Sequence, residues 1–363
     1  METILILIPR FGVGGISKIG AFIANTLSEE YTVVLTSLIP DEATCFISER
    51  VIRTTLSYDF TSKRDGALIQ LYDKAGVLTR LRKTLIEYKV NLICSLGLDL
   101  GKIALLASAG LPCKCLSSER GNPYRYSKKQ RFQYDIVVRK SDAIVFQTQM
   151  AMDAFPKCAI NGKAFIIQNP AIGRNTTTYH VGKVDERRKR IIYCGRLSRE
   201  KNIDMLIKAY SAINTNDYRL IIYGDGPEYS HLKRLIEEKD LLKTVEIIRN
   251  CDDVFAKEAD SEIFVLTSNE EGMPNALIEA MMCGMACIVT DSPPGGCREL
   301  LLGGKRGILI PVNDDKSLTD ALESLIKDSE KIKCLGEAAK TICQTNSVEV
   351  IQKKWIEVVR SLV

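Results

Sequence analysis

Residues 268–291 read SNEEGMPNALIEAMMCGMACIVTD, a stretch that predicts a loop, then a helix, then a buried strand. The glycine and proline of GMPN keep the helix from starting earlier. Glu271 therefore stands in the loop ahead of the helix, and Glu279 lies two turns inside it. Carboxylates placed in this way can accept hydrogen bonds from two parts of one polyhydroxylated ligand. The alternative is that Glu271 only complements the helix dipole while Glu279 is a solvated acid on the helix surface.

Strand-like runs alternate with helical patterns on both sides of this stretch. Runs rich in β-branched residues lie in the first half at 4–8, 31–38, 90–96, 142–148 and 164–170, and in the second half at 190–197, 218–227, 245–248, 262–268, 286–291 and 306–312. Apolar residues at helical spacing fit between them, as in 18–27. The alternation predicts an α/β fold of βαβ units, in which parallel sheets carry helices on both faces.

The length of 363 residues favours two domains, at about 150 residues per domain. The polar stretch GRNTTTYHVGKVDERRKR lacks apolar periodicity and separates the two series of strands. We therefore expect a Rossmann-like N-terminal domain at 1–172, a linker at 173–190 and a Rossmann-like C-terminal domain at 191–345. Residues 346–363 have a helical pattern, and we expect a C-terminal helix that can pack back on the N-terminal domain.

Composition and charge exclude several classes of protein. The chain is 45% hydrophobic and 26% charged, as globular proteins are, and its net charge of +5 is too small to argue for nucleic-acid binding. No run approaches the ~20 apolar residues of a membrane span. Glu2 stands where a secretion signal would carry a cation, so we expect a cytoplasmic protein. The twelve cysteines have no repeated CxxC spacing, which predicts reduced core cysteines and no metal site.

Glycines and cations follow several of the predicted strands. The first strand ends in PRFGVGGISKIG, where Gly14 and Gly15 precede a helix and would let backbone N–H groups approach an anion. The motif matches neither a strict dinucleotide fingerprint nor a Walker loop, and a simple tight turn is the alternative. In YCGRLSREKN at 193–202, Arg196 and Lys201 suit a diphosphate, although a solvated pair on a loop is also consistent. GDGP at 224–227 begins with Gly224 and predicts another turn at the same sheet edge.

The most basic stretch of the chain runs from Arg120 to Lys140. Asp135 is its single acid, and its cations and aromatic residues are Arg120, Arg125, Lys128, Lys129, Arg131, Arg139, Lys140, Tyr124, Tyr126, Phe132 and Tyr134. We expect this stretch to attach the N-terminal domain peripherally to an anionic membrane surface. The alternatives are a solvated basic face and burial of the tyrosines in the core.

Taken together, these motifs resemble the retaining nucleotide-sugar glycosyltransferases of family 4, the group 1 glycosyltransferases, which have the GT-B fold. The resemblance is carried by GVGG, GRLSREKN, GDGP and the E-x7-E pair of EEGMPNALIEAMMCG, and it is most specific over residues 190–312. It implies two Rossmann-like domains that face a central cleft, with the acceptor on the N-terminal domain and a UDP-sugar on the C-terminal domain. It also implies retention by front-face attack, with the leaving phosphate taking the acceptor proton and with no metal or other cofactor.

Carried over residue by residue, the resemblance assigns Arg196 and Lys201 to the donor diphosphate and Glu279 to the ribose hydroxyls. Glu271 is assigned to the transferred sugar, and with the two cations it forms the expected catalytic group. Neighbouring residues are expected to bind substrate: Gly224, Gly272, Met273, Pro274, Asn275 and Leu277. Gly14 and Gly15 are expected to close over the diphosphate or the acceptor from the other domain.

The chain departs from the family pattern at one histidine. Many relatives have a histidine in the N-terminal domain that faces the sugar, whereas here His180 lies in the predicted linker and His231 on a helix beyond GDGP. The segment SSERGNPYRY at 117–126 resembles the SERNDP-type loop of relatives that build surface polysaccharides. We therefore expect Glu119 and Arg120 to border the active cleft, with a buried structural ion pair as the alternative.

The function implied by the resemblance is transfer of a hexose or N-acetylhexosamine from a UDP-sugar to a glycan acceptor. The acceptor is expected to be linked to a lipid diphosphate, in the assembly of capsule, O-antigen, lipopolysaccharide or exopolysaccharide. Two alternatives remain at this point: a non-catalytic GT-B subunit that binds a partner transferase, and a GT-B epimerase or phosphorylase-like enzyme.

Overall fold

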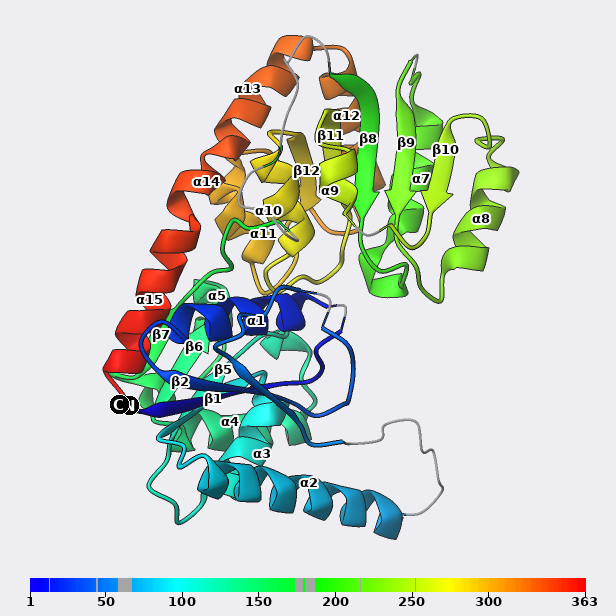
Figure 1. Ribbon diagram of the computed structural model, residues 1–363. Helices are drawn as coiled ribbons and strands as arrows, with labels where there is room; N and C mark the ends of the chain where they lie inside the picture. The colour runs from blue at the N-terminus through cyan, green and yellow to red at the C-terminus, as the bar shows by residue number, and fades with distance from the viewer. Residues whose placement is uncertain are drawn as a thin grey trace. The chain divides into compact units, whose positions relative to one another are not determined.

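The computed structural model describes residues 1–12, 14–43, 45–57, 67–173, 179, 187–215, 217–251 and 253–363. The chain divides into two compact units, shown in Figure 1. The first consists of Met1–Asn169 together with Glu349–Val363, and the second of Pro170–Val348. Each unit is described by itself below.

The first unit is built on a parallel sheet with the strand order β3-β2-β1-β4-β5-β6-β7. Its strands are β1 (Thr3–Ile8), β2 (Thr32–Ser37), β3 (Ile52–Thr55), β4 (Leu92–Leu96), β5 (Lys114–Ser118), β6 (Ala143–Phe146) and β7 (Ala164–Ile166). Its helices are α1 (Gly15–Leu27), α2 (Ala67–Glu87), α3 (Leu98–Ser108), η1 (Pro123–Arg125), α4 (Lys128–Lys140), α5 (Gln149–Asp153), α6 (Lys157–Ile160) and α15 (Val348–Arg360).

The sequence of the first unit explains these elements locally. All six residues of β1 are buried, as expected for an apolar strand covered by helices on both faces. The helix α4 starts where Ser127 and Gln130 form a capping box, in which each side chain bonds the backbone of the other. The helix α15 buries Trp355 in this unit.

The second unit is built on a parallel sheet with the strand order β10-β9-β8-β11-β12-β13. Its strands are β8 (Arg188–Cys194), β9 (Arg219–Tyr223), β10 (Val245–Ile248), β11 (Ser261–Leu266), β12 (Ala286–Thr290) and β13 (Ile308–Ile310). Its helices are η3 (Arg199–Lys201), α7 (Ile203–Ala212), α8 (Tyr229–Glu238), α9 (Val254–Lys257), α10 (Asn275–Met282), α11 (Gly296–Leu300), η4 (Leu302–Gly304), α12 (Asp315–Ile326), α13 (Ser329–Lys340) and α14 (Ile342–Thr345).

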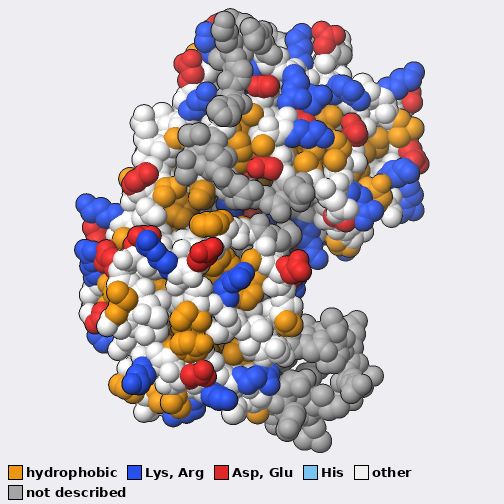
Figure 2. All heavy atoms as spheres, viewed as in Figure 1, with side chains coloured by type: hydrophobic (Ala, Val, Ile, Leu, Met, Phe, Trp, Pro, Cys, Tyr) orange, Lys and Arg blue, Asp and Glu red, His pale blue; other side chains and the backbone are white. Residues whose placement is uncertain are grey.

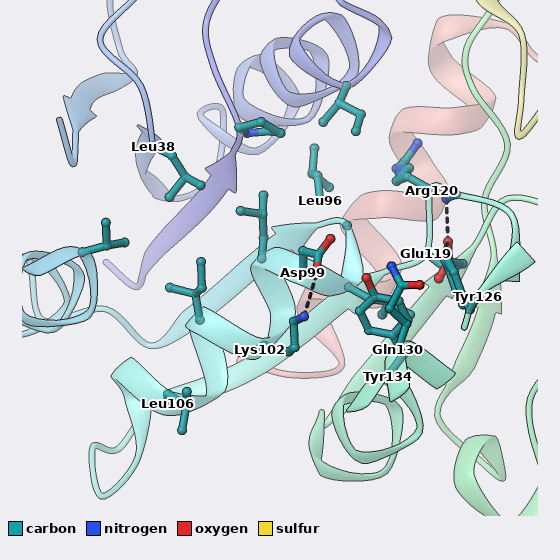
Figure 3. A pocket seen from close by; sticks show the side chains of 18 of the residues that line it. Leu38, Leu96, Asp99, Lys102, Leu106, Glu119, Arg120, Tyr126, Gln130 and Tyr134 are labelled. Atoms are coloured by element: carbon teal, nitrogen blue, oxygen red, sulfur yellow. Dashed lines mark hydrogen bonds and ion pairs between the residues drawn. The ribbon is translucent and has the colours of Figure 1, made fainter. Parts of the chain in front are cut away.

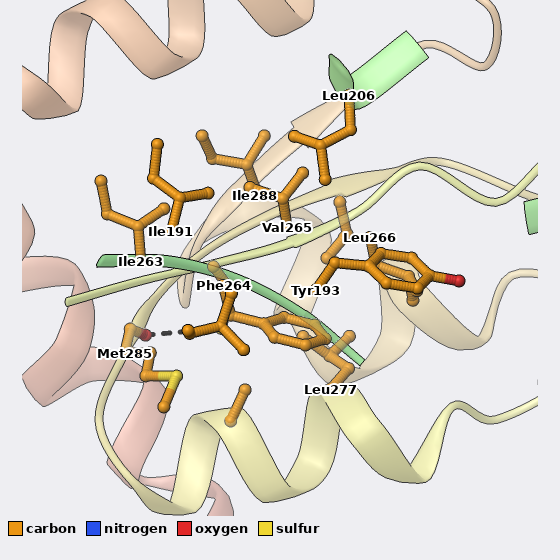
Figure 4. Packing of buried hydrophobic residues seen from close by; sticks show 14 of the residues in the cluster. Ile191, Tyr193, Leu206, Ile263, Phe264, Val265, Leu266, Leu277, Met285 and Ile288 are labelled. Carbon is orange, nitrogen blue, oxygen red and sulfur yellow. Dashed lines mark hydrogen bonds between the residues drawn. The ribbon is translucent and has the colours of Figure 1, made fainter. Parts of the chain in front are cut away.

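The core of the second unit lies on both faces of its sheet. Figure 4 shows Val265 and Phe264, neighbours on β11, pointing to opposite faces, the first toward Leu206 of α7 and the second toward Leu277 of α10. This alternation is the period-two geometry of a strand. It fixes α7 and α10 on opposite sides of β11.

The predicted α/β class with two Rossmann-like parallel sheets is confirmed. The chain passes from the first unit to the second between Asn169 and Pro170, and the predicted boundary lies after residue 172. Most of the predicted linker, 174–178 and 180–186, lies outside the described residues. Its last part belongs to β8, which begins at Arg188. The strand was predicted from residue 190, and its charged first residues were placed in the linker. Arg190 is tolerated there because it pairs with the buried carboxylate of Glu258 at 2.9 Å.

Membrane spans and cysteines can be checked within the described chain. No helix among the described residues combines the length and the apolar character needed to cross a bilayer. All twelve cysteines are free thiols, and Cys94, Cys115, Cys283, Cys287 and Cys297 are buried. The expectation of core cysteines is wrong for three that are exposed: Cys158, Cys334 and Cys343.

Candidate functional site

The strand order of the second unit reverses between β8 and β11, which are neighbours in its sheet. In open parallel sheets, ligands bind at the carboxyl ends of the strands on either side of such a reversal. Arg196 and Lys201 follow β8, and Glu271 follows β11. The structure therefore brings these three predicted residues to one edge of the sheet.

Lys201 and Glu271 form an ion pair between Nζ and Oε1, although seventy residues separate them in the chain. The two side chains are 20% and 12% exposed. Ser268 Oγ also donates to Glu271 Oε1, at 3.0 Å, and the Glu271 backbone N–H donates to the carbonyl of Pro293 at 3.0 Å. Lys201 and Ser268 thus orient the carboxylate, and the contact with Pro293 anchors the Glu271 backbone.

Arg196 has a different environment from Lys201. Its side chain is exposed and makes no hydrogen bond or ion pair with any described residue. Its carbonyl accepts from the hydroxyl of buried Tyr193 at 3.3 Å, so the backbone is anchored while the guanidinium stays available. One cation of the predicted diphosphate site is therefore paired, and the other is free among the described residues.

The nearby carboxylate of Glu200 adds a local charge. Ser198 Oγ donates to Glu200 Oε1 at 2.5 Å, and this hydrogen bond holds the pKa of the Glu200 carboxyl below its usual value. The Glu200 carbonyl accepts from the Asn269 backbone at 2.8 Å. The loops after β8 and β11 are therefore joined by backbone as well as by the ion pair.

The helix α10 begins directly after the loop that carries Glu271. Pro274 precedes its first residue, and no side chain caps it. The first N–H groups of a helix have no acceptor inside the helix and carry partial positive charge, so this end suits an anion. Farther along α10, Glu279 Oε2 accepts from the hydroxyl of Tyr179 at 3.2 Å.

Two predicted substrate-binding residues have buried side chains. Met273 and Leu277 belong to the hydrophobic core of the second unit. Both side chains pack against other core residues, so we assign neither of them a contact with a ligand. Their backbone groups remain as candidate contacts, together with Gly272, Pro274 and the half-buried Asn275.

Glycine at 224 and 296 is explained by close backbone packing. A Cβ on Gly224 would lie 1.9 Å from the carbonyl oxygen of Gly195, and a Cβ on Gly296 would lie 1.7 Å from that of Gly272. The structure thus accounts for Gly224 without a ligand, and its assignment to substrate stays a prediction. Gly296 supports the loop beside Glu271, and sequence reasoning missed it.

Three further contacts of the site were missed from the sequence. Tyr179 lies in the polar predicted linker, where nothing marked it as a partner of Glu279. Ser268 and Pro293 are ordinary loop residues in the sequence, and only the run SPPGG at 292–296 signalled a tight turn behind the site.

The first unit holds the remaining predicted residues. Gly14 and Gly15 lie at the start of α1, which has no side-chain cap. Glu119 follows β5 and is 1% exposed. Its Oε1 accepts from the Gly121 backbone at 2.5 Å and from the Tyr126 hydroxyl at 2.7 Å. Burial raises the pKa of the Glu119 carboxyl.

Arg120 does not lie on a basic surface, contrary to its place in the predicted membrane-binding stretch. Its Nε donates to Ser118 Oγ at 2.9 Å and its NH1 to Asn169 Oδ1 at 3.0 Å, while its guanidinium lies 5.9 Å from the Trp355 ring. Burial lowers the pKa of the Arg120 guanidinium to about 10. No direct ion pair joins Arg120 to Glu119, although the neighbouring Glu119 carboxylate acts to raise the pKa of the Arg120 guanidinium against the effect of burial.

The rest of the basic stretch divides into buried and exposed residues. Arg131 pairs with Asp135 at 3.2 Å and stacks on Phe155, and Tyr134 is buried. Six exposed residues of α4 share about 120° of its circumference at 3.6 residues per turn. We call them the α4 outer face: Lys128, Lys129, Phe132, Ile136, Arg139 and Lys140.

Charge elsewhere on the surface is mixed. On the face shown in Figure 2, Lys and Arg side chains are interspersed with Asp and Glu side chains in each unit. His231 of α8 pairs with Asp204 at 2.7 Å in the second unit, and His180 lies outside the described residues. Among the described residues, no three His, Cys, Asp or Glu side chains cluster as metal ligands would.

A family model described as "Glycosyl transferases group 1" matches residues 177–342. Two relatives match along nearly their whole length at 24% identity. One is the Campylobacter jejuni "GalNAc-alpha-(1->4)-GalNAc-alpha-(1->3)-diNAcBac-PP-undecaprenol alpha-1,4-N-acetyl-D-galactosaminyltransferase", with 99% of this chain and 98% of the relative covered. The other is the Erwinia amylovora "Amylovoran biosynthesis glycosyltransferase AmsD", with 99% of each covered.

Coverage is smaller for a relative of higher identity. An exopolysaccharide phosphotransferase of Streptomyces coelicolor is 31% identical over 178 residues, and the match spans 48% of this chain but 19% of that protein's length. The match therefore covers only about a fifth of the Streptomyces protein, which is the longer of the two chains.

Solved structures match over both units. Sucrose-phosphate synthase of Thermosynechococcus elongatus has a TM-score of 0.85 at 16% identity, covering 100% of this chain and 99% of that one. Anabaena HepE, solved in complex with UDP-glucose, has a TM-score of 0.76 at 17% identity, covering 99% of this chain and 100% of that one. At such identity, these matches establish the fold alone.

Proposed function

We propose that this chain, which belongs to the group 1 glycosyltransferases and has the GT-B fold, transfers a sugar from a UDP-sugar to a glycan acceptor. The sugar is a hexose or N-acetylhexosamine, and it is transferred with retention. The observation that carries the proposal is the group formed by Arg196, Lys201 and Glu271 at the start of α10, where the strand order of the second unit reverses.

The chemistry of this group fits the departure of a nucleoside diphosphate. Negative charge grows on the leaving phosphate as the glycosidic bond breaks. Cations and helix N–H groups beside the phosphate stabilise that charge, and most strongly where they are already fixed in place, as Lys201 is by its ion pair. Arg196 and Lys201 supply the cations, and the uncapped start of α10 supplies the dipole.

The carboxylates act on the rest of the donor. Glu271, held by Lys201 and Ser268, accepts hydrogen bonds from hydroxyls of the transferred sugar. Glu279 accepts hydrogen bonds from the ribose. In front-face retention, the leaving phosphate itself takes the proton of the attacking hydroxyl, so no side chain in the group has to act as a base.

Relatives support the choice of donor and acceptor. HepE was solved with UDP-glucose, and the Campylobacter relative is named for an acceptor joined to undecaprenol through a diphosphate. The Erwinia relative is named for synthesis of amylovoran. We therefore propose a lipid-diphosphate-linked acceptor and a role in the assembly of a bacterial surface polysaccharide.

The test is UDP release from a panel of UDP-sugars, first without an acceptor and then with a lipid-linked glycan. A transferase hydrolyses its own donor slowly and releases UDP faster when the acceptor is added. Arg196→Gln should abolish that release, while Arg199→Gln, a matched exposed arginine three residues away, should not. Absence of UDP release with every donor would favour a non-catalytic subunit, and conversion of the sugar with no glycan product would favour an epimerase.

The α4 outer face supports peripheral binding to an anionic membrane. It combines four cations with two exposed apolar side chains, of which Phe132 is 68% exposed. Anionic lipid attracts such cations by about 1 kcal/mol per residue near the headgroups, and an aromatic side chain can enter the interface.

Co-sedimentation with phosphatidylglycerol vesicles tests this attachment. Changing Lys128, Lys129 and Lys140 together to serine should reduce binding, and added salt should reduce binding of the parent. Changing the exposed Lys233, Lys239 and Lys243 of the second unit to serine removes the same charge and should leave binding unchanged. Equal binding by the two triple variants would refute the membrane proposal and leave the transferase proposal intact.

A further inference from the structure

A tyrosine of the second unit bonds to the carboxylate that we assign to the ribose. The hydroxyl of Tyr179 donates to Glu279 Oε2 at 3.2 Å, although 100 positions of the sequence separate the two residues. Glu279 is on α10, which begins at Asn275. At 1.5 Å per residue, Glu279 lies about 6 Å along the helix from the end that we assign to the diphosphate. A ribose joined to that diphosphate can reach a side chain so close to the helix start.

The ring of Tyr179 is held against the core of its unit. The side chain is half-buried and packs on the hydrophobic core. Its ring centroid lies 6.5 Å from that of Phe255, which in turn lies 5.9 Å from that of Phe264. Tilted aromatic rings at such distances attract each other. The hydroxyl is therefore positioned by contacts that do not depend on Glu279.

A second residue that precedes β8 contacts the same helix. Arg187 Nη1 donates to the carbonyl of Gly284 at 2.7 Å, and its Nη2 donates to the carbonyl of Cys283, which caps α10, at 2.9 Å. A cation at the carboxyl end of a helix is favoured by the helix dipole. Tyr179 and Arg187 thus contact α10 along its length and at its end.

Tyrosine hydroxyls donate to glutamates elsewhere in the chain, and four such pairs can be compared. They are Tyr126–Glu119, Tyr179–Glu279, Tyr218–Glu262 and Tyr223–Glu258. Figure 3 shows Glu119 next to Tyr126 in the first unit. Glu119 and Glu258 are buried, and a buried carboxylate needs donors to offset its loss of water.

The two half-buried carboxylates differ in their place in the second unit. Glu262 is the second residue of β11, at the amino end of that strand. Glu279 lies on the helix that begins at the carboxyl edge of the sheet, where parallel sheets bind ligands. Of the four carboxylates, Glu279 alone combines partial exposure with a place beside that edge.

The contact with Tyr179 is compatible with a ligand on the same carboxylate. A carboxylate has about four acceptor positions, and one phenol proton uses one of them. Burial, followed by the charges of Glu279 and Asp253, raises the pKa of the Tyr179 phenol, so the hydroxyl keeps its proton. The hydroxyl can therefore orient the carboxylate without displacing a ribose.

We propose that Tyr179 is a positioning residue for the donor, whose hydroxyl holds the Glu279 carboxylate in the orientation that binds the ribose hydroxyls. Tyr179 itself does not contact the substrate. The inference rests on the proposed function, because that function places the ribose at Glu279. It adds that the preference of the site for a ribonucleotide depends on Tyr179.

The test is calorimetry of the full chain with UDP and with 2′,3′-dideoxyuridine diphosphate, which lacks both ribose hydroxyls. Tyr179→Phe removes one hydrogen-bond donor and keeps the ring. Its Kd for UDP should rise about threefold to tenfold, as expected for one hydrogen bond, and its Kd for the dideoxy nucleotide should change by less than about twofold. A purely structural role would weaken both nucleotides alike.

Tyr218→Phe is the matched control. Its hydroxyl also donates to a half-buried glutamate, but that pair lies at the amino ends of β9 and β11. This variant should change neither Kd. Glu279→Ala tests whether Tyr179 acts through the carboxylate. It should weaken UDP binding by itself, and adding Tyr179→Phe to it should weaken binding no further.

Four results would overturn the inference. They are tighter UDP binding by Tyr179→Phe, which would mean that the hydroxyl competes with the ribose, equal weakening of the two nucleotides, unchanged binding of both, and a further loss when Tyr179→Phe is added to Glu279→Ala. UDP release from a UDP-sugar is measured in parallel. Release by a parent whose preference for UDP survives Tyr179→Phe refutes only this inference. Loss of that preference in Tyr179→Phe, with no UDP release from any donor by the parent, refutes only the proposed transfer.

Discussion

Lys201 and Arg196 are expected to differ when each is changed to glutamine, although both are assigned to the donor diphosphate. Lys201 is paired with Glu271, and Arg196 has no partner among the described residues. Two unit charges 4 Å apart interact by about 4 kcal/mol at an effective dielectric of about 20. Because the two paired side chains are 20% and 12% exposed, solvent screening reduces this to about 2 kcal/mol.

The stability of the second unit should follow from that pair. Loss of about 2 kcal/mol corresponds to a fall in Tm of roughly 4–8 °C for Lys201→Gln. Arg196→Gln should change Tm by less than about 1 °C, because this exposed side chain makes no hydrogen bond or ion pair with a described residue. The double variant Lys201→Gln/Glu271→Gln should recover more than half of the lost Tm, since it no longer leaves a carboxylate without its cation.

Affinity for UDP should distinguish the same variants by calorimetry. A charge-assisted hydrogen bond contributes about 1.5–3 kcal/mol, so Arg196→Gln should raise Kd roughly 10- to 150-fold. Lys201→Gln should raise Kd further, because it also exposes the diphosphate to the unneutralised Glu271 carboxylate. Adding Glu271→Gln should restore part of that loss. Unchanged Kd in Arg196→Gln, or a smaller loss for Lys201→Gln than for Arg196→Gln, would refute the placement of the diphosphate.

Three further outcomes are expected. Glu279→Gln should mainly raise the KM for donor, while Glu271→Gln should mainly lower kcat, and the reverse pattern would invert the placement of the donor. Activity should survive chelation by EDTA, and a requirement restored by Mg²⁺ or Mn²⁺ would contradict this. Burial raises the pKa of Glu119, so protonation stabilises the folded first unit, and this contribution is lost as pH rises above the ordinary glutamate value. The Tm of Glu119→Gln, followed by Trp355 fluorescence, should therefore rise relative to the Tm of the parent as the pH is raised from 4 to 7. A difference in Tm that stays constant over this range would refute the argument.

The sequence predicts strands best where both faces are buried. The strands β1, β4 and β11 contain the apolar runs ILILI, LIC and IFVL, and their positions follow from these runs. The edge strand β3 was missed because its four residues, IRTT, alternate between half-buried and exposed. A half-exposed edge strand has too little apolar signal to distinguish it from a loop.

The residue types of the donor site were predictable, but their pairing was not. Spacing placed Arg196, Lys201 and Glu271 after two strands, and the rule for parallel sheets brought those strands to one edge. No local pattern joined Lys201 to Glu271, since the contact depends on β8 and β11 being neighbours. Tyr179 could not be linked to Glu279 either, because their contact joins positions 100 residues apart and no local pattern predicts it.

The difference between paired Lys201 and unpaired Arg196 bears on how the site can serve both binding and turnover. A paired lysine keeps the Glu271 carboxylate oriented before any donor arrives, so the group that meets the sugar is set in advance. An unpaired arginine gives up no protein contact when it meets a phosphate, so its interaction can strengthen as charge grows on the leaving group. Interactions that are stronger in the transition state than in the ground state raise the rate, whereas uniform ones only raise affinity. Arg196 is therefore the residue whose loss should lower kcat most for a given loss of UDP affinity, and Lys201 the one whose loss should disturb sugar placement as well.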